Sequence, residues 1–431
     1  MIFFEKVINR SIPLWAFVLA VMSLSFTFSC ALFLVHNEGL AKKYAPATHS
    51  VLISSINTVT TFVTQFRALI NTGQINPQVK AVEFPTGFFV PINESLKGRL
   101  LVSSFDVKHG VSSIFLFDVQ TQELLKSWYP DIGELADLSA KSKVETAENL
   151  PQNFRSQHPI MTQDGGVIIS SGEGMMVKLG NDSKIEWHID RHFHHSIEPA
   201  LSDNQYITQI VINRPVTLKN GKELKGLRND GYAVFSGDGR FIEEKSLAQI
   251  LIDNGYEGLL LGSAWEGDRI HLNDAEYIFE TDEYVRKGDV MLSARNLSIV
   301  LLYRPDENKV IWLQQGPFLN QHDIDYLGNG QFSIFGNDNV RFGNPRIYSS
   351  FSSIYLFDMK TNSTQKFLTL DSAGVSADTQ GRSQLLDNGD IFVDDGMRAM
   401  ILDNTGNIKL SYSHPAGKNN AGAMHWSRYL P

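Results

Sequence analysis

Histidines recur just before short apolar runs that turn back on themselves, and imidazoles serve as nucleophiles, acid–base groups and metal ligands. His158, His322 and Arg382 each lie six or seven residues before an Asn-Gly or Asp-Gly turn. His195 and His271 lead into further runs of the same kind. One residue type at one place in a repeated unit indicates a shared site.

The repeated unit is a β-hairpin pattern that occurs six times. Its first strands are predicted at 114–118, 175–179, 232–235, 298–303, 354–358 and 399–403. A second hairpin precedes most copies, as at 159–170, 324–335 and 385–393. Radial repetition of four-stranded units is typical of a β-propeller, so we predict an all-β, six-bladed β-propeller over residues 80–431. A β-sandwich with extensions does not explain six copies.

The N-terminal residues differ in composition from the rest of the chain. Ser11 to Val35 carries no charge and exceeds the roughly 20 apolar residues that span a bilayer, so residues 1–40 are expected to form a transmembrane signal anchor. Residues 41–79 are expected to form a helical stalk, because apolar residues in 48–69 recur with the spacing of an amphipathic helix. A buried core helix and a lipoprotein modified at Cys30 are the alternatives to the anchor.

Charge and cysteine content exclude two classes of function. The formal net charge of −9 argues against a nucleic-acid partner, because phosphate binding needs a basic surface. Cys30 is the only cysteine and lies in the apolar segment, so disulfides and cysteine metal sites are excluded from the rest of the chain.

Equivalent positions in successive blades surround the axis of a propeller, so these histidines are expected to ring one mouth of its centre. Four interpretations follow: polar strand ends bonded to neighbouring blades, a metal site, an anion pocket, or covalent catalysis by a neutral histidine. A local metal site would use His188, His192, His194 and His195. No matched carboxylate motif accompanies them, so no metal is expected.

Four segments carry a resemblance to a known family. The segment Gln321–Asn337 is similar to the catalytic-histidine region of arylsulfotransferases. Ile270–Asn273 resembles the family's second histidine motif, and Leu292–Arg295 resembles its Ser-x-Arg strand end. His194-His195 resembles a further histidine pair before a strand. The similarity covers roughly residues 155–340.

The resemblance implies a six-bladed propeller that acts outside the cytoplasm of a bacterium. Such an enzyme moves a sulfuryl group from an aryl sulfate donor to a phenolic acceptor, without a nucleotide donor or another cofactor. His322 would take the group covalently in a ping-pong cycle, and His271, Arg295 and His195 would bind its oxygens or assist the leaving phenolate. The residues expected to bind substrate are His194, His158, Asn273, Asn337 and Arg382.

With the predicted anchor, this implies a single-pass protein of the bacterial inner membrane with its propeller in the periplasm. Two departures, Phe-Gly-Asn at Phe335–Asn337 and a helix in place of an extra N-terminal β-domain, leave a phenol, a peptide tyrosine or a glycan open as acceptor.

The rival function is a non-catalytic extracytoplasmic propeller that binds an anionic ligand or a partner protein. An enzyme needs His322 in an accessible pocket, whereas a structural histidine would be bonded on both nitrogens and closed off. Asp323 is expected to be a structural partner, because consecutive side chains of a strand point apart. The C-terminal residues 425–428 are expected to close the ring.

Overall fold

The computed structural model describes residues 78–90, 96–144, 154–263, 267–340, 348 and 350–431. The predicted anchor at 1–40 and almost all of the predicted stalk at 41–79 lie outside these residues. Within the described part of the chain, no helix combines the length and apolar character that a bilayer crossing requires. On this finding we correct the predicted localisation, and the assignment to the inner membrane with a periplasmic propeller is withdrawn.

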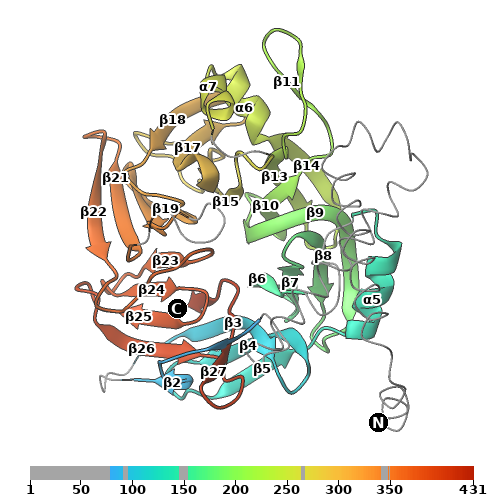
Figure 1. The fold of residues 1–431 in the computed structure, drawn as a ribbon, viewed down its shortest axis with the longest axis vertical. Coiled ribbons are helices and arrows are strands. Elements are labelled where there is room, and N and C mark those ends of the chain that lie inside the picture. Colours follow the sequence, from blue (N-terminus) through green and yellow to red (C-terminus); the bar gives the residue numbers. More distant parts are fainter. Residues whose placement is uncertain (1–77, 91–95, 145–153, 264–266, 341–347, 349) are drawn as a thin grey trace, which may run out of the picture. The chain divides into compact units, whose positions relative to one another are not determined.

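Antiparallel sheets stand around a common centre, so the predicted all-β propeller is confirmed (Figure 1). Residues Gln78–Pro431 form one compact unit. Three of its sheets have four strands. They are β28 (Arg428–Leu430), β3 (Arg99–Asp106), β4 (Val111–Asp118) and β5 (Leu124–Trp128); β15 (Leu272–Tyr277), β16 (Val290–Ala294), β17 (Ile299–Arg304) and β18 (Lys309–Gln315); and β19 (Asp323–Gly328), β20 (Gln331–Gly336), β21 (Ser353–Asp358) and β22 (Ser363–Thr369).

The other two large sheets among the described residues have five and seven strands. The five-stranded sheet comprises β23 (Arg382–Leu385), β24 (Ile391–Asp394), β25 (Ala399–Leu402), β26 (Ile408–Ser413) and β2 (Gly87–Phe89). The seven-stranded sheet comprises β6 (Gln157–Met161), β7 (Val167–Ser170), β8 (Gly174–Leu179), β9 (Ile185–Pro199), β10 (Gln205–Val211), β13 (Asp230–Ser236) and β14 (Phe241–Ser246).

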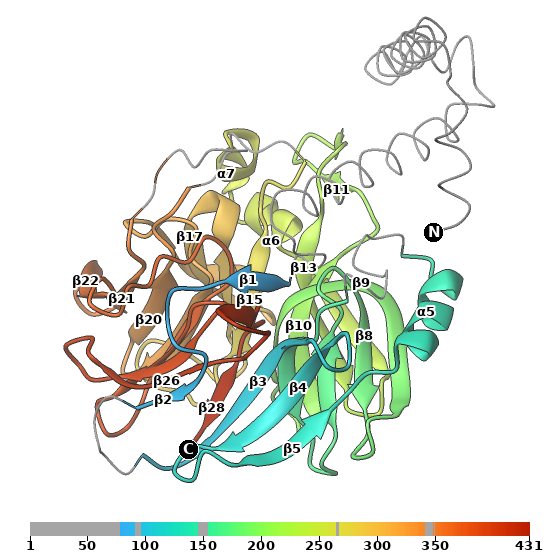
Figure 2. The same cartoon turned by 60° about the horizontal axis from the view of Figure 1, so that its bottom comes forward.

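Small sheets and short helices accompany the large sheets, as Figure 2 shows from a second direction. Two small sheets pair β1 (Val79–Ala81) with β27 (Asn420–Gly422) and β11 (Val216–Thr217) with β12 (Glu223–Leu224). The helices are α5 (Ile132–Lys141), α6 (Leu247–Asp253), α7 (Glu257–Leu261) and the 3₁₀ turn η3 (Arg295–Leu297).

The six predicted hairpins are all present, as β4–β5, β8–β9, β13–β14, β17–β18, β21–β22 and β25–β26. The prediction of six separate blades is wrong, because β9 pairs with β8 through Phe193 and with β10 from Phe193 onward. Apolar and polar residues alternate from Ile185 to Asp190, and the strand then continues through Arg191 and His192 to Phe193 and joins its neighbours into one sheet.

The hydrophobic cores lie between neighbouring sheets. One core packs Tyr232 of β13 against Leu301 of β17. Another packs Val300 of β17 against Ile334 of β20. Side chains alternate across a strand, so each sheet presents one apolar face to each neighbour. This packing fixes how close the inner ends of the sheets approach one another.

Buried carboxylates link the inner strands of consecutive sheets. In each link, one Oδ2 accepts a hydrogen bond from a backbone N–H at the start of the next inner strand. The pairs are Asp230–Leu272 (3.0 Å), Asp274–Ile324 (3.1 Å), Asp323–Ser383 (2.9 Å) and Asp394–Ser427 (2.6 Å). We call Asp230, Asp274, Asp323 and Asp394 the clasp carboxylates. The structural role predicted for Asp323 is therefore confirmed.

The C-terminal residues close the ring, as the sequence predicts. Strand β28 pairs with β3 of the N-terminal sheet, and the N–H of His425 donates to the carbonyl of Ser103 (3.1 Å). Asp394 holds this closure, because its Oδ1 also accepts the N–H of Gly396 (2.7 Å).

Replacing Asp394 with alanine is expected to lower the free energy of unfolding by about 1–3 kcal/mol, because two buried N–H groups lose their acceptor. Asp403→Ala is the matched control, since Asp403 also accepts two backbone N–H groups, but on an exposed turn where water replaces it. Urea unfolding of both variants measures the difference. Equal losses would show that the clasp adds nothing to closure.

Candidate functional site

The structure brings the predicted histidines together at the centre of the ring. His195 is their hub, with ring centroids 4.9 Å from His271, 5.0 Å from His194, 6.1 Å from His322 and 6.3 Å from His158. Apart from the adjacent pair His194 and His195, these residues come from segments far apart in the sequence, so the fold rather than the local sequence assembles the cluster.

Three of these histidines have a left-handed backbone. The φ angles of His158, His195 and His271 are 50°, 56° and 50°. This conformation costs an L-residue about 1–2 kcal/mol. Such strain concentrates at functional sites, where the surrounding structure enforces it. Here it bends the chain close to the inner strands and turns the imidazoles toward one another.

His322 is held by both ring nitrogens. Its Nδ1 lies 2.6 Å from Oδ1 of Asn337, and its Nε2 accepts the N–H of Gln380 at 3.0 Å. The amide of Asn337 is oriented by its Nδ2, which donates to the carbonyls of Ala377 and Gln380. Oδ1 of Asn337 can only accept, so Nδ1 of His322 carries the proton and Nε2 keeps its lone pair.

The ring of His322 is also closed off, since the residue is 1% exposed. In this conformation His322 is therefore bonded on both nitrogens and closed off, as we expect of a structural histidine. The tautomer, in contrast, is the one in which Nε2 can act as a nucleophile or acceptor once the N–H of Gln380 moves away.

Burial lowers the pKa of His322 well below the usual value, and the nearby Arg295 guanidinium lowers it further. Burial likewise lowers the pKa values of His158, His194 and His195. These four histidines are therefore neutral imidazoles at neutral pH. A neutral imidazole retains the lone pair that nucleophilic or acceptor chemistry needs.

Arg295 is a buried cation with few partners. It begins η3 directly after β16, and its backbone N–H donates to the carbonyl of His271 (3.0 Å). The residue is 8% exposed, and among the described residues its Nη1 has only a long bond to Asn296 (3.4 Å) and its Nε has no partner. Burial lowers its pKa, and the carboxylates of Asp268 and Asp378 oppose that shift. Its unused donors make it an anion-binding group.

His271 is paired with a carboxylate that sequence reasoning missed. Its Nδ1 lies 2.6 Å from Oδ2 of Asp268, and its side chain is 17% exposed. Burial raises the pKa of Asp268, but the bond to His271 and nearby cations outweigh it and lower the pKa overall. An ionised Asp268 accepts the Nδ1–H of His271 and orients its ring. The only sequence signal was an aspartate three residues before the histidine.

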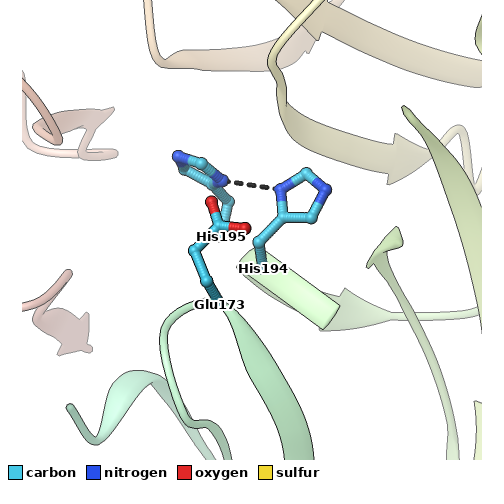
Figure 3. Close-up of side chains that lie close together, drawn as sticks. All are labelled: Glu173, His194 and His195. Atoms are coloured by element: carbon cyan, nitrogen blue, oxygen red, sulfur yellow. Dashed lines mark hydrogen bonds between the residues drawn. The ribbon is translucent and has the colours of Figure 1, made fainter. Parts of the chain in front are cut away.

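A second group beside the cluster is Glu173, His194 and His195, shown in Figure 3. One potential ligand atom of each lies within 4.8 Å of the others, as a metal ion would require. However, Nδ1 of His194 and Nδ1 of His195 share a hydrogen bond (2.8 Å), and Glu173 is paired with Arg228 (3.0 Å). A guanidinium beside the carboxylate disfavours a cation there.

Arg228 also bonds to Asp230 (Nε–Oδ1 2.8 Å), and His192 bonds to Glu173 (2.7 Å). Sequence reasoning missed Glu173, Arg228 and Asp230. They come from different strands and loops, and no short motif joins them.

The residues predicted to bind substrate fall into two groups. Asn273 and Asn337 are occupied by protein partners: the amide of Asn273 donates to the carbonyl of Gln321 (2.8 Å) and accepts from Ser293 (2.9 Å). Both asparagines therefore position the segment around His322.

His158 and Arg382 lie apart from this network. His158 packs on Trp426 with ring centroids 3.6 Å apart, and neither of its nitrogens has a partner. Arg382 faces Glu198 (3.9 Å) and other carboxylates of the inner strands, so its charge is already engaged.

The sequence model described as Arylsulfotransferase (ASST) matches residues 158–417, which is more than half of the chain. The chain belongs to the arylsulfotransferase family. The match begins at His158 and extends beyond the roughly 155–340 that the motifs indicated. It includes every predicted site residue. Family membership supports a sulfotransferase-like function for this arylsulfotransferase.

Other comparisons say less about this arylsulfotransferase. No curated protein matches it. A Bacteroides caccae protein of unknown function is 12% identical, with a TM-score of 0.45 over 78% of this chain and 99% of that one. The Neurospora crassa Pan2 WD40 domain is 11% identical, with a TM-score of 0.40 over 79% and 86%. At these scores neither likeness bears on function.

We expect the His322 imidazole to stay neutral, with the proton on Nδ1, as the pH falls from 7.5 to about 5.5. Its lowered pKa leaves nothing to titrate near pH 6.5. ¹⁵N chemical shifts of labelled histidine, assigned with His322→Gln, test this. The urea-unfolded chain is the control, because its histidines titrate near 6.5. Titration of folded His322 near that value would contradict the tautomer assignment.

Proposed function

We propose that the chain transfers a sulfuryl group from an aryl sulfate donor to a phenolic or other hydroxyl acceptor, such as a glycan. In this proposal residues 80–431 form the catalytic domain, His322 is the nucleophile, and no cofactor or nucleic acid takes part. The observation that carries it is the state of His322: a buried, neutral imidazole with its lone pair on Nε2, beside the incompletely bonded guanidinium of Arg295.

In the first half-reaction, the lone pair of His322 Nε2 attacks sulfur. The N–S bond forms as the S–O bond to the aryl group breaks, and the electron pair leaves on the phenolate oxygen. A phenol has a pKa near 10, so a proton donor assists its departure. His271 supplies this proton, because Asp268 holds its Nδ1 and no described residue bonds to its Nε2.

In the second half-reaction, the acceptor hydroxyl oxygen attacks sulfur and the N–S bond breaks. The electron pair returns to Nε2 of His322, and the acceptor's proton passes to the now neutral His271. Arg295 and His195 hold the sulfuryl oxygens in both steps, as fixed donors do in phosphoryl transfer. Asn337 keeps Nε2 directed at sulfur.

In this structure the donor has no access to Nε2 of His322. Nε2 of His322 is capped by the N–H of Gln380, so residues 376–381 must move before the donor can approach. Gln380 has a left-handed backbone (φ 65°) and precedes Gly381 (φ 103°), which allows a hinge at this point. The substrate would displace one backbone hydrogen bond.

The same cap favours the second candidate function, a non-catalytic propeller that binds an anionic ligand. His322 would then be structural, bonded on both nitrogens, and Arg295 alone would bind the anion. The two functions differ in whether a covalent sulfohistidine forms.

His322→Ala is expected to reduce transfer from 4-nitrophenyl sulfate to phenol on the order of 10⁴-fold or more, because the nucleophile is gone. His188→Ala is the matched control, since His188 is an exposed histidine of β9. Mass spectrometry of donor-treated, alkali-quenched full-length protein looks for a sulfuryl group on His322. Wild-type turnover by His322→Ala would reject the nucleophile, and no turnover by wild-type protein would favour the binding function.

Asp268→Asn is expected to lower kcat about 10²-fold with aryl sulfates whose phenols are weakly acidic. The variant keeps an acceptor for Nδ1 of His271 but removes the negative charge beside the imidazole. Donors with more acidic phenols need less assistance, so their rates should fall less. An equal loss across a donor series would exclude His271 as the proton donor.

A further inference from the structure

Five carboxylates gather on the inner strands next to the histidine cluster, outside the groups that the proposed reaction uses. Asp274 and Glu276 lie two residues apart on β15, and Asp323 and Asp325 lie two apart on β19. Residues two apart face the same side of a strand. Glu198 of β9 is the fifth.

Three of these carboxylates converge closely. One oxygen each from Asp274, Glu276 and Asp323 lies within 4.8 Å of the other two. Asp274 and Asp323 are buried, whereas Glu276 is only half-buried, so solvent reaches this group. Asp274 and Asp323 are clasp carboxylates, and each uses one oxygen to accept a backbone N–H. Their second oxygens remain for another ligand.

The charge of this cluster is not balanced by its protein neighbours. Arg428 forms a bidentate pair with Glu198 (2.8 and 2.9 Å) and neutralises it. Arg382 interacts with Asp323, Asp325 and Glu276 among the remaining four carboxylates. One guanidinium against four carboxylates leaves an excess of negative charge in a buried place, which is costly without a further cation or protons.

One buried oxygen of the cluster has no hydrogen bond of ordinary geometry from the described residues. Asp274 is 0% exposed, and its Oδ1 has no hydrogen-bond partner among the described residues. The nearby hydroxyl of Ser196 is engaged by Gln209, whose Nε2 donates to it (2.8 Å) and whose Oε1 accepts from it (3.2 Å). A buried carboxylate oxygen without a partner requires an explanation, and an unseen ion is one.

We propose that Asp274, Glu276 and Asp323 bind a divalent, oxygen-seeking cation, with calcium as the preferred ion. The donors are all carboxylate oxygens, which suit hard cations and not zinc or copper. Calcium–oxygen bonds of about 2.3–2.6 Å let one ion bridge oxygens roughly 4.8 Å apart, whereas magnesium needs about 2.0–2.1 Å and near-octahedral geometry. Water completes the coordination through the exposed side of Glu276.

The cation would join two strands that position the histidines. His271 directly precedes β15, and His322 directly precedes β19. A shared ion between Asp274 and Asp323 therefore ties these strands together beside the cluster and stabilises the folded protein. Its binding does not depend on the sulfuryl-transfer proposal, because none of its ligands takes part in that reaction.

The test uses the full-length protein, treated with EDTA and desalted. Titration with CaCl₂ alone is expected to show saturable binding of about one ion per chain by calorimetry and a rise in Tm, because a ligand that binds the folded state stabilises it. MgCl₂ should bind more weakly. No heat and no change in Tm with millimolar CaCl₂ or MgCl₂ would overturn the proposal and leave protons as the charge partners of the cluster.

Two charge-neutralising variants locate the site. Glu276→Gln keeps the side-chain volume and is expected to weaken calcium binding on the order of tenfold or more. Glu243→Gln removes the same charge from an exposed position of β14 and should leave calcium affinity unchanged. Equal affinity in both variants would place the calcium elsewhere and overturn the assignment. Activity is not the readout, so an inactive protein can still pass or fail this test.

Discussion

The hydrogen bonds between the clasp carboxylates and the next inner strand are the constraint on which the site depends. Sheets packed only through apolar faces could slide along one another, because hydrophobic contact is not directional. Each clasp instead joins a particular aspartate to a particular N–H, as Asp323 does to Ser383. A hydrogen bond of this kind contributes about 0.5–1.5 kcal/mol net. The clasps thus fix the register of strands whose first residues carry the site.

Joining the inner strands through buried carboxylates creates an electrostatic problem. Clasp carboxylates from consecutive strands meet at the narrow centre of the ring, where Asp274 and Asp323 come close to Glu276 and Asp325. Burial and mutual repulsion raise the pKa of Asp274 to about 8. The carboxylates that position the inner strands therefore also concentrate negative charge, which two arginines balance only in part.

The sequence predicts those parts of the fold that rest on local signals. Alternating apolar residues and a turn mark each hairpin in the sequence, so all six predicted strand pairs are correct. The repeat then predicts that His195, His271 and His322 meet, because equivalent positions surround one axis. The fusion of two units through β9 was missed because no sequence signal distinguishes a strand that ends from one that continues into a second pairing. Pairing is decided by neighbours distant in the chain.

The electrostatic environment of the site was less predictable than its histidines. Asp268 and Arg228 have ordinary surface-like sequence contexts, and only the fold shows that both are partly buried beside imidazoles. Their effect is to separate two histidines chemically. Next to Arg295, His322 is kept neutral, whereas His271 is hydrogen-bonded to the carboxylate of Asp268. Different partners on two like residues suit the different tasks of a nucleophile and a proton donor. The repeat places the same side chain at both positions, and different neighbours give His322 and His271 different chemical environments.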